Sequence, residues 1–184
     1  MDGPHAKVTA QLNMRLPRIV AVKGEDGSQI QALLSHLAAS WRARGLRVAG
    51  VVEECKAGKT VLRDLKSGVC HPLKQDLGPG STSCSLDAAG LAAACFSVET
   101  AIEAGCDAVI LSKFGKMEAL GGGLAGAFYA AIAADRPIVT SVSPSLTEAW
   151  GGFADPLAMF IKPDYDAIEA WRLAVAKCEQ NLIV

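Results

Sequence analysis

Short apolar runs alternate with helical segments along most of this chain, and that alternation is what most constrains its fold. Five runs have the length and composition of strands: RIVAVK (18–23), RVAGVV (47–52), DAVILS (107–112), PIVTSV (137–142) and AMFIK (158–162). Segments with apolar residues at helical spacing lie between most of these runs. Strands that alternate with helices form a mostly parallel sheet with helices on both faces. We therefore expect a three-layer α/β domain.

The first helical segment shows the pattern most clearly. Asp26 and Gln29 can form a capping box, and Gly45 suits the position after a helix end. The apolar residues between them recur at i, i+3, i+4, i+7, i+8 and i+11: Ile30, Leu33, Leu34, Leu37, Ala38 and Trp41. Together with the strands on either side, this helix makes a βαβ unit, whose crossover should be right-handed.

Other segments complete the expected organisation. Residues 60–65 and 69–73 flank Lys66-Ser67-Gly68 and predict a β-hairpin inserted into the α/β chain. Three more helices are expected: one from Asp87 to Gly105, one across residues 120–132, and a C-terminal helix opened by Pro163 and Asp164. Residues 143–157 suggest irregular structure. We expect an N-terminal tail (1–17) and a single domain (18–184).

Composition excludes several functional classes. The 184 residues include 18 Lys and Arg against 19 Asp and Glu, for a net charge of −1. A general nucleic-acid-binding protein would show a basic excess. The longest uncharged apolar run, residues 119–134, is too short to cross a bilayer, so we expect a cytoplasmic protein without membrane insertion. A homo-oligomer is compatible with this composition.

Metal binding is not expected. The three histidines are scattered, and none of the six cysteines forms a CxxC pair.

Ligands of parallel α/β folds bind at the carboxyl ends of the strands, and three loops qualify there. Together they offer glycine amides, hydroxyls and positive charge, which suit an anion. The candidate anion-binding residues are Gly24, Asp26, Gly27 and Ser28; Ser81, Ser83 and Cys84; and Lys113 and Lys116. Simpler interpretations stay open: a turn capped by Asp26, helix capping by residues 81–85, and surface ion pairs of the two lysines with Glu118 or Asp26.

No intact phosphate-binding loop is present. The segment from Gly24 to Ile30 has the glycines but lacks the lysine and following hydroxyl of G-x-x-x-x-G-K-[ST]. Residues 57–60, AGKT, look like the end of such a loop. However, Glu53 stands where its first glycine should be, and a strand follows rather than a helix.

Two families resemble this chain. Residues 109–118, VILSKFGKME, resemble the segment IDEIGKME of the cancer-related nucleoside-triphosphatases, which are small P-loop NTPases. The segments LKSG, LGPGSTSCSLD, SKFGKMEALGGG and AWGGF are more closely similar to a bacterial family of unknown function often associated with molybdenum transport. This second resemblance covers residues 18–175. The two resemblances imply a P-loop-NTPase-like fold and an anionic ligand, which is a nucleotide phosphate or an oxyanion such as molybdate.

The chain departs from the NTPase pattern at two places. The acidic pair that would hold Mg²⁺ falls on Ser112 and Lys113, and the phosphate-binding lysine is missing, although GKME at 115–118 is retained. The leading hypothesis is therefore a protein that binds an anion without efficient hydrolysis. One alternative is an active nucleoside triphosphatase in which Glu118 orients water. Another is a regulatory or scaffold protein with a vestigial pocket.

Overall fold

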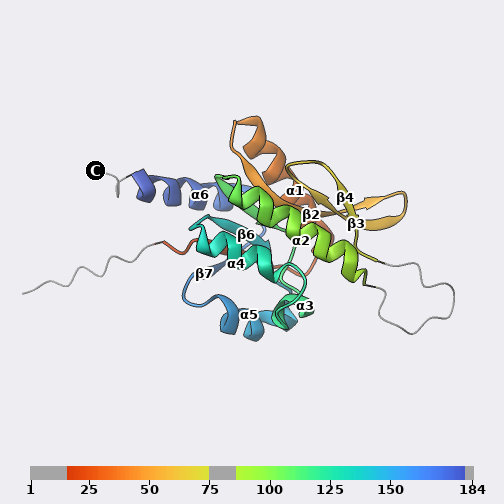
Figure 1. Ribbon diagram of the computed structural model, residues 1–184. Helices are drawn as coiled ribbons and strands as arrows, with labels where there is room; N and C mark the ends of the chain where they lie inside the picture. The colour runs from red at the N-terminus through yellow and green to blue at the C-terminus, as the bar shows by residue number, and fades with distance from the viewer. Residues whose placement is uncertain (1–15, 75–85, 181–184) are drawn as a thin grey trace, which may run out of the picture.

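The computed structural model describes residues 16–74 and 86–180, which form a seven-stranded sheet with helices on both sides (Figure 1). The strands are β1 (Ile19–Val22), β2 (Val48–Lys56), β3 (Lys59–Asp64), β4 (Cys70–Pro72), β5 (Ala108–Leu111), β6 (Ile138–Ser141) and β7 (Ala158–Ile161). The helices are α1 (Gly27–Ala43), α2 (Ala88–Glu103), α3 (Lys116–Ala119), α4 (Ala125–Ala133), α5 (Thr147–Ala154) and α6 (Tyr165–Gln180), with a 3-10 turn, η1 (Pro144–Leu146), before α5.

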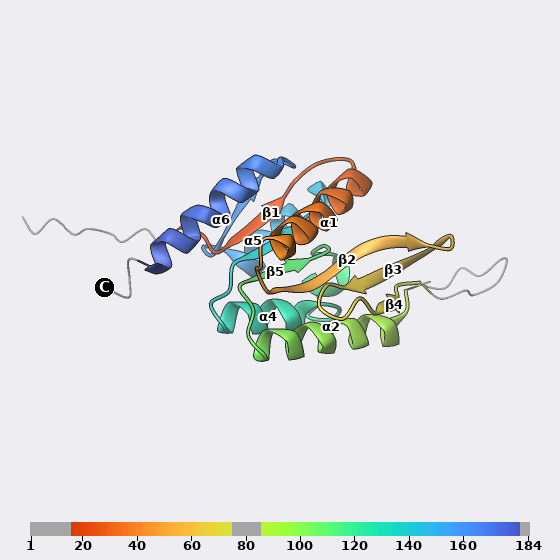
Figure 2. The same ribbon diagram turned by 90° about the horizontal axis from the view of Figure 1, so that it is seen from above.

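The strand order is β4-β3-β2-β5-β6-β1-β7. Strands β2, β5, β6, β1 and β7 run parallel, whereas β3 and β4 are antiparallel additions at one edge. Helices α1 and α6 lie on one side of the sheet and α2 and α4 on the other (Figure 2). The three-layer, mostly parallel α/β prediction is thus confirmed, and the fold is P-loop-NTPase-like.

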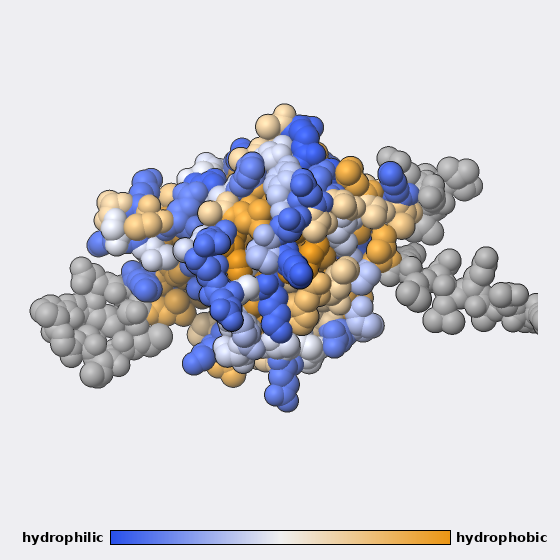
Figure 3. All heavy atoms as spheres, turned by 180° about the vertical axis from the view of Figure 1, so that it is seen from behind, coloured by the Kyte–Doolittle hydropathy of each residue, from blue (hydrophilic) through white to orange (hydrophobic). Residues whose placement is uncertain are grey.

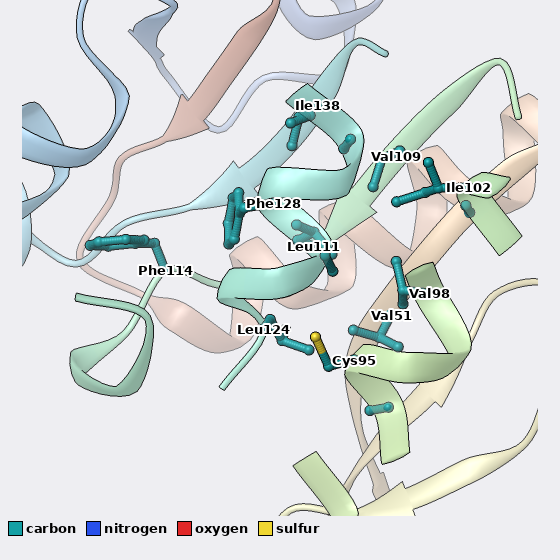
Figure 4. Close-up of a cluster of buried hydrophobic side chains, with 14 of the residues drawn as sticks. Val51, Cys95, Val98, Ile102, Val109, Leu111, Phe114, Leu124, Phe128 and Ile138 are labelled. Atoms are coloured by element: carbon teal, nitrogen blue, oxygen red, sulfur yellow. The ribbon is translucent and has the colours of Figure 1, made fainter. Parts of the chain in front are cut away.

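Each face of the sheet has its own apolar core. The larger core joins the sheet to α2, α4 and α5, and Figure 4 shows Cys95, Val98 and Phe128 from this cluster. The smaller core joins the sheet to α1 and α6, with Trp41 and Trp171 as its largest side chains. Burial of the aliphatic strand residues on both faces explains why these strands read as continuous apolar runs.

The antiparallel edge is larger than the sequence suggested. The β3–β4 hairpin was expected, and its connection is held by the buried Asp64. Strand β2, however, continues beyond Val52 to Lys56 and turns back into β3. Ala57 and Gly58 form this two-residue turn with φ values of +50° and +75°, as a type I′ hairpin requires. The AGKT segment is therefore a hairpin turn.

The expectation of irregular structure across residues 143–157 was wrong for most of that segment. It contains η1 and the eight-residue helix α5, whose Trp150 and Ala154 are buried one turn apart. The expected helix over 120–132 also begins later, at Ala125, because residues 116–119 form the separate short helix α3. Prolines and paired glycines are typical of loops, and only two residues of α5 are buried, so the sequence of this segment does not show a helical apolar pattern.

On the side shown in Figure 3, hydrophilic and apolar side chains are interspersed, with strongly apolar side chains near the middle. Among the described residues, no helix is both long enough and apolar enough to span a membrane.

Candidate functional site

A cleft of about 400 Å³ opens at the carboxyl ends of three parallel strands. The chain leaves β1 toward the α1 side of the sheet and leaves the neighbouring β6 toward the α5 side. Such a divergence is the switch point at which open α/β sheets bind ligands. The cleft is lined by Gly24, Glu25, Gly27, Ile30 and Gln31 after β1, by Glu53 on β2, by residues 113–116 after β5, and by residues 141–146 after β6.

The cleft brings together two of the three loops proposed from the sequence. Gly24 and Gly27 lie on one wall, and Lys113 and Lys116 come from the loop after β5. Ser28 lines an adjoining cavity instead. Ser81, Ser83 and Cys84 lie outside the described residues.

Asp26 is the N-cap of α1, as the capping pattern indicated. Its Oδ1 accepts hydrogen bonds from the Ser28 amide at 2.9 Å, the Ser28 hydroxyl at 2.7 Å and the Gln29 amide at 3.1 Å. The Ser28 hydroxyl and the Gln29 amide hold the pKa of this carboxyl below its usual value. The carboxylate of Asp26 therefore occupies two of the amides that a phosphate would use at this helix terminus.

Lys113 has a different partner from those considered in the sequence. Its Nζ lies 2.5 Å from Oε1 of Glu53, rather than beside Glu118 or Asp26. The Glu53 side chain is 17% exposed and that of Lys113 is 49% exposed. The Lys113 side chain is therefore partly open to solvent and the cleft, while the carboxylate of Glu53 balances its charge.

Gln31 fixes the strand ends beneath this ion pair. Its Nε2 donates to the carbonyl of Ser112 at 2.7 Å, and its Oε1 accepts from the amide of Glu53 at 3.1 Å. One side chain of α1 thus bridges β5 and β2, which holds the floor of the cleft rigid.

Glu118 is a structural residue in this arrangement. It is only 5% exposed, and its two carboxylate oxygens accept the amides of Gly115 and Leu124, both at 2.8 Å. It therefore closes the loop between β5 and α4. Gly123, at φ +59°, lies so close that a Cβ there would stand 2.1 Å from Oε1 of Glu118. Each oxygen thus accepts one backbone amide in a side chain that is almost fully buried, which gives Glu118 a structural role in this loop.

Sequence reasoning missed the third wall of the cleft, which carries Ser141, Ser143 and Ser145. The Ser141 hydroxyl donates to the carbonyl of Ser112 at 2.7 Å, and the hydroxyls of Ser143 and Ser145 lie 3.1 Å apart. The signal was present as three serines at the end of a buried strand. Nothing in the neighbouring sequence places these serines beside the lysines of the loop after β5, because that proximity depends on the order of the strands in the sheet.

The cleft lining includes two carboxylates, Glu25 and Glu53, the second of which is paired with Lys113. Its other polar groups include two lysines, three hydroxyls and glycine backbone. These are donor groups that suit a small anion, since charge-assisted hydrogen bonds are the strong ones. Within residues 16–74 and 86–180, no three His, Cys, Asp or Glu side chains gather where they could hold a metal ion.

Comparison with known proteins gives two matches. The family model described as "Protein of unknown function (DUF2478)" matches residues 19–171. The chain is also similar to "Molybdenum import ATP-binding protein ModC 2" of Bradyrhizobium diazoefficiens, with 34% identity over 161 residues. That alignment covers 84% of this chain but 18% of ModC 2, so the chain spans under a fifth of its relative's length. No solved structure matches the chain.

Proposed function

The chain belongs to the DUF2478 family, and from the geometry of its cleft we propose that it binds an anion there without efficient hydrolysis. The ligand carries a tetrahedral oxyanion group, either as the phosphate of a nucleotide or as a free ion such as molybdate. The observation that carries this proposal is the convergence of Lys113, Lys116 and the glycines of the β1–α1 loop on one switch-point cleft.

Two further observations support the choice of an anion. The third wall adds Ser143 and Ser145, whose mutual hydrogen bond leaves one O–H free to donate to an oxyanion oxygen, whereas the Ser141 hydroxyl donates to the carbonyl of Ser112. The similarity to ModC 2, whose name refers to molybdenum and ATP, favours the same two ligand classes. Because the relative is much longer than the matched region, its named activity enters only as support for the ligand class.

The proposed absence of efficient hydrolysis is supported by residues that are present. Ser112 and Lys113 stand where a magnesium-binding acidic pair would be, and Glu118 is bound to two backbone amides. A cation in place of a carboxylate disfavours Mg²⁺ and can itself offset the charge of a ligand.

Calorimetric titration of the full chain with molybdate, sulfate, phosphate and ATP, each with and without Mg²⁺, tests the proposal. We expect at least one of these anions to bind without Mg²⁺ and with a 1:1 ratio. Binding that requires Mg²⁺ would favour the triphosphatase alternative. A chain that binds none of the four would have the vestigial pocket of a scaffold protein, and the proposal would be wrong.

A further inference from the structure

A second cavity of about 460 Å³ adjoins the cleft, on the α1 side of the β2–β3 hairpin. We will call it the side cavity; it is lined by Ser28, Gln31, Ala32, Ser35, Glu53, Glu54, Cys55 and Thr60. Gln31 and Glu53 line the cleft as well as the side cavity, so the two hollows share a wall. Figure 2 shows the hairpin extending past α1, while α2 covers it from the other side.

The two hollows differ in chemistry. The cleft contains Lys113 and Lys116, whereas no lysine or arginine lines the side cavity. Its polar lining consists of hydroxyls, an amide and two carboxylates, all of which can accept hydrogen bonds. A ligand that filled both hollows would therefore carry an anionic group at one end and hydrogen-bond donors at the other.

The charges of the two carboxylates decide which donors fit. Glu53 is paired with Lys113 at 2.5 Å, and Glu54 is paired with Arg63 at 2.6 Å. Glu54 is thus balanced by Arg63, and Glu53 would share Lys113 with the anionic group of the ligand, so neither carboxylate is a free partner for an ammonium group. A neutral hydroxyl of the ligand can donate a hydrogen bond to a lone pair that remains on either carboxylate, or to the side-chain oxygen of Ser35 or Gln31.

From this arrangement we infer that the side cavity receives the hydroxylated part of the ligand, so that the ligand is a sugar phosphate or similar polyol phosphate ester rather than a free oxyanion. The inference rests on the proposed anion site, because the phosphate would be held in the cleft by the lysines and serines. The shared wall at Gln31 and Glu53 would lie alongside the bond between the two parts.

Titration calorimetry with inorganic phosphate, ribose 5-phosphate and phosphoethanolamine tests the inference on the full chain. We expect ribose 5-phosphate to bind about tenfold more tightly than phosphate, the gain that one or two additional neutral hydrogen bonds give. Phosphoethanolamine should show no such gain. Equal affinities for phosphate and ribose 5-phosphate would overturn the inference while leaving the anion site intact. Failure of all three to bind would refute the inference and remove its support from the anion proposal.

Two variants test whether the additional affinity for ribose 5-phosphate arises in the side cavity. Ala32→Leu places a larger side chain into the side cavity, and Ser35→Ala removes one acceptor there. Ala32→Leu should abolish the advantage of ribose 5-phosphate, and Ser35→Ala should reduce it about threefold, with phosphate binding unchanged in both. Ala39→Leu, an exposed position further along α1 and outside both hollows, is the matched control. An advantage that survives Ala32→Leu would place the hydroxylated part elsewhere and refute the inference.

Discussion

Lys113 and Glu53 face each other across two neighbouring parallel strands, with 2.5 Å between Nζ and Oε1. The register of the sheet produces this contact. Val51 on β2 pairs with Leu111 on β5, and Glu53 and Lys113 each follow two residues later. Two residues of extended chain return a side chain to the same face of a sheet. Before any ligand binds, Lys113 of the proposed anion site is therefore already paired with the Glu53 carboxylate.

This pairing predicts opposite effects for its two members. Lys113→Met should lower affinity for the anion about tenfold, because one charge-assisted hydrogen bond is lost. Glu53→Gln should raise affinity several-fold, because the anion no longer competes with a carboxylate for Lys113. Titration calorimetry of both variants with sulfate measures these effects, and Lys59→Met on the hairpin serves as a control for lost surface charge. A loss of affinity in both variants would mean that the intact ion pair, and not the free lysine, forms the site.

Glu118 gives a prediction about stability rather than binding. In Glu118→Gln one carboxylate oxygen becomes an NH₂ group, which cannot accept the amide of Gly115 or Leu124. An unsatisfied buried donor costs about 1–3 kcal/mol, so the variant should unfold at correspondingly lower urea concentration. Glu99→Gln, a partly buried position on α2, provides a comparison. A fully stable Glu118→Gln protein that lost a catalytic activity would instead assign Glu118 to chemistry.

The strands and the long helices could be predicted because each carries one dominant signal. Strands β5 (108–111) and β6 (138–141) are buried on both faces, and such burial selects unbroken aliphatic runs. Helix α1 was predictable from its apolar spacing and from Asp26, whose capping hydrogen bonds the structure contains. These signals are local in the chain, so a sequence displays them directly.

The contacts of the site were less predictable because they depend on register between distant strands. Nothing near Lys113 in the sequence identifies Glu53, sixty residues earlier, as its partner. The serine wall at 141–145 was missed for a related reason, since its place in the cleft depends on β6 lying beside β1. Helix α5 has only two fully buried side chains, too few to give a clear period.

Nucleoside triphosphate hydrolysis should be very slow. By the resemblance to the nucleoside-triphosphatases, Ser112 and Lys113 fall where that family has an acidic pair for Mg²⁺, and the Asp26 carboxylate accepts two amides at the start of α1. Phosphate release from ATP and GTP with Mg²⁺, measured at high protein concentration, should stay far below the ~1 s⁻¹ of ordinary enzymes. A hydrolysis activity at or above that rate would show that the site is an active triphosphatase, provided that it co-purifies with the chain and is lost in Lys113→Met.

Glu169 on α6 links that helix to α1 and should make stability dependent on acid pH. Burial raises the pKa of Glu169, but hydrogen bonds from Arg172, Arg44 and Trp41 outweigh it and lower the pKa from 4.5 to about 2. The Trp41 indole donates to Oε2 at 2.6 Å, and the Arg44 guanidinium contacts Oε1 at 2.8 Å. The native carboxylate is thus favoured over the protonated form more strongly than in the unfolded chain.

Because the folded pKa lies below the unfolded one, this stabilisation is complete above about pH 4.5 and is lost as the pH falls toward about 2. A shift of this size corresponds to about 3 kcal/mol. Glu169→Gln should therefore unfold more easily than the parent at neutral pH, by up to that amount. The difference between the two proteins in urea denaturation should shrink steadily below about pH 4.5. Glu103→Gln, on the exposed side of α2, should show no such convergence. A stability difference that is constant from neutral pH to about pH 3 would mean that packing of the side chain, and not its charge, joins α6 to α1.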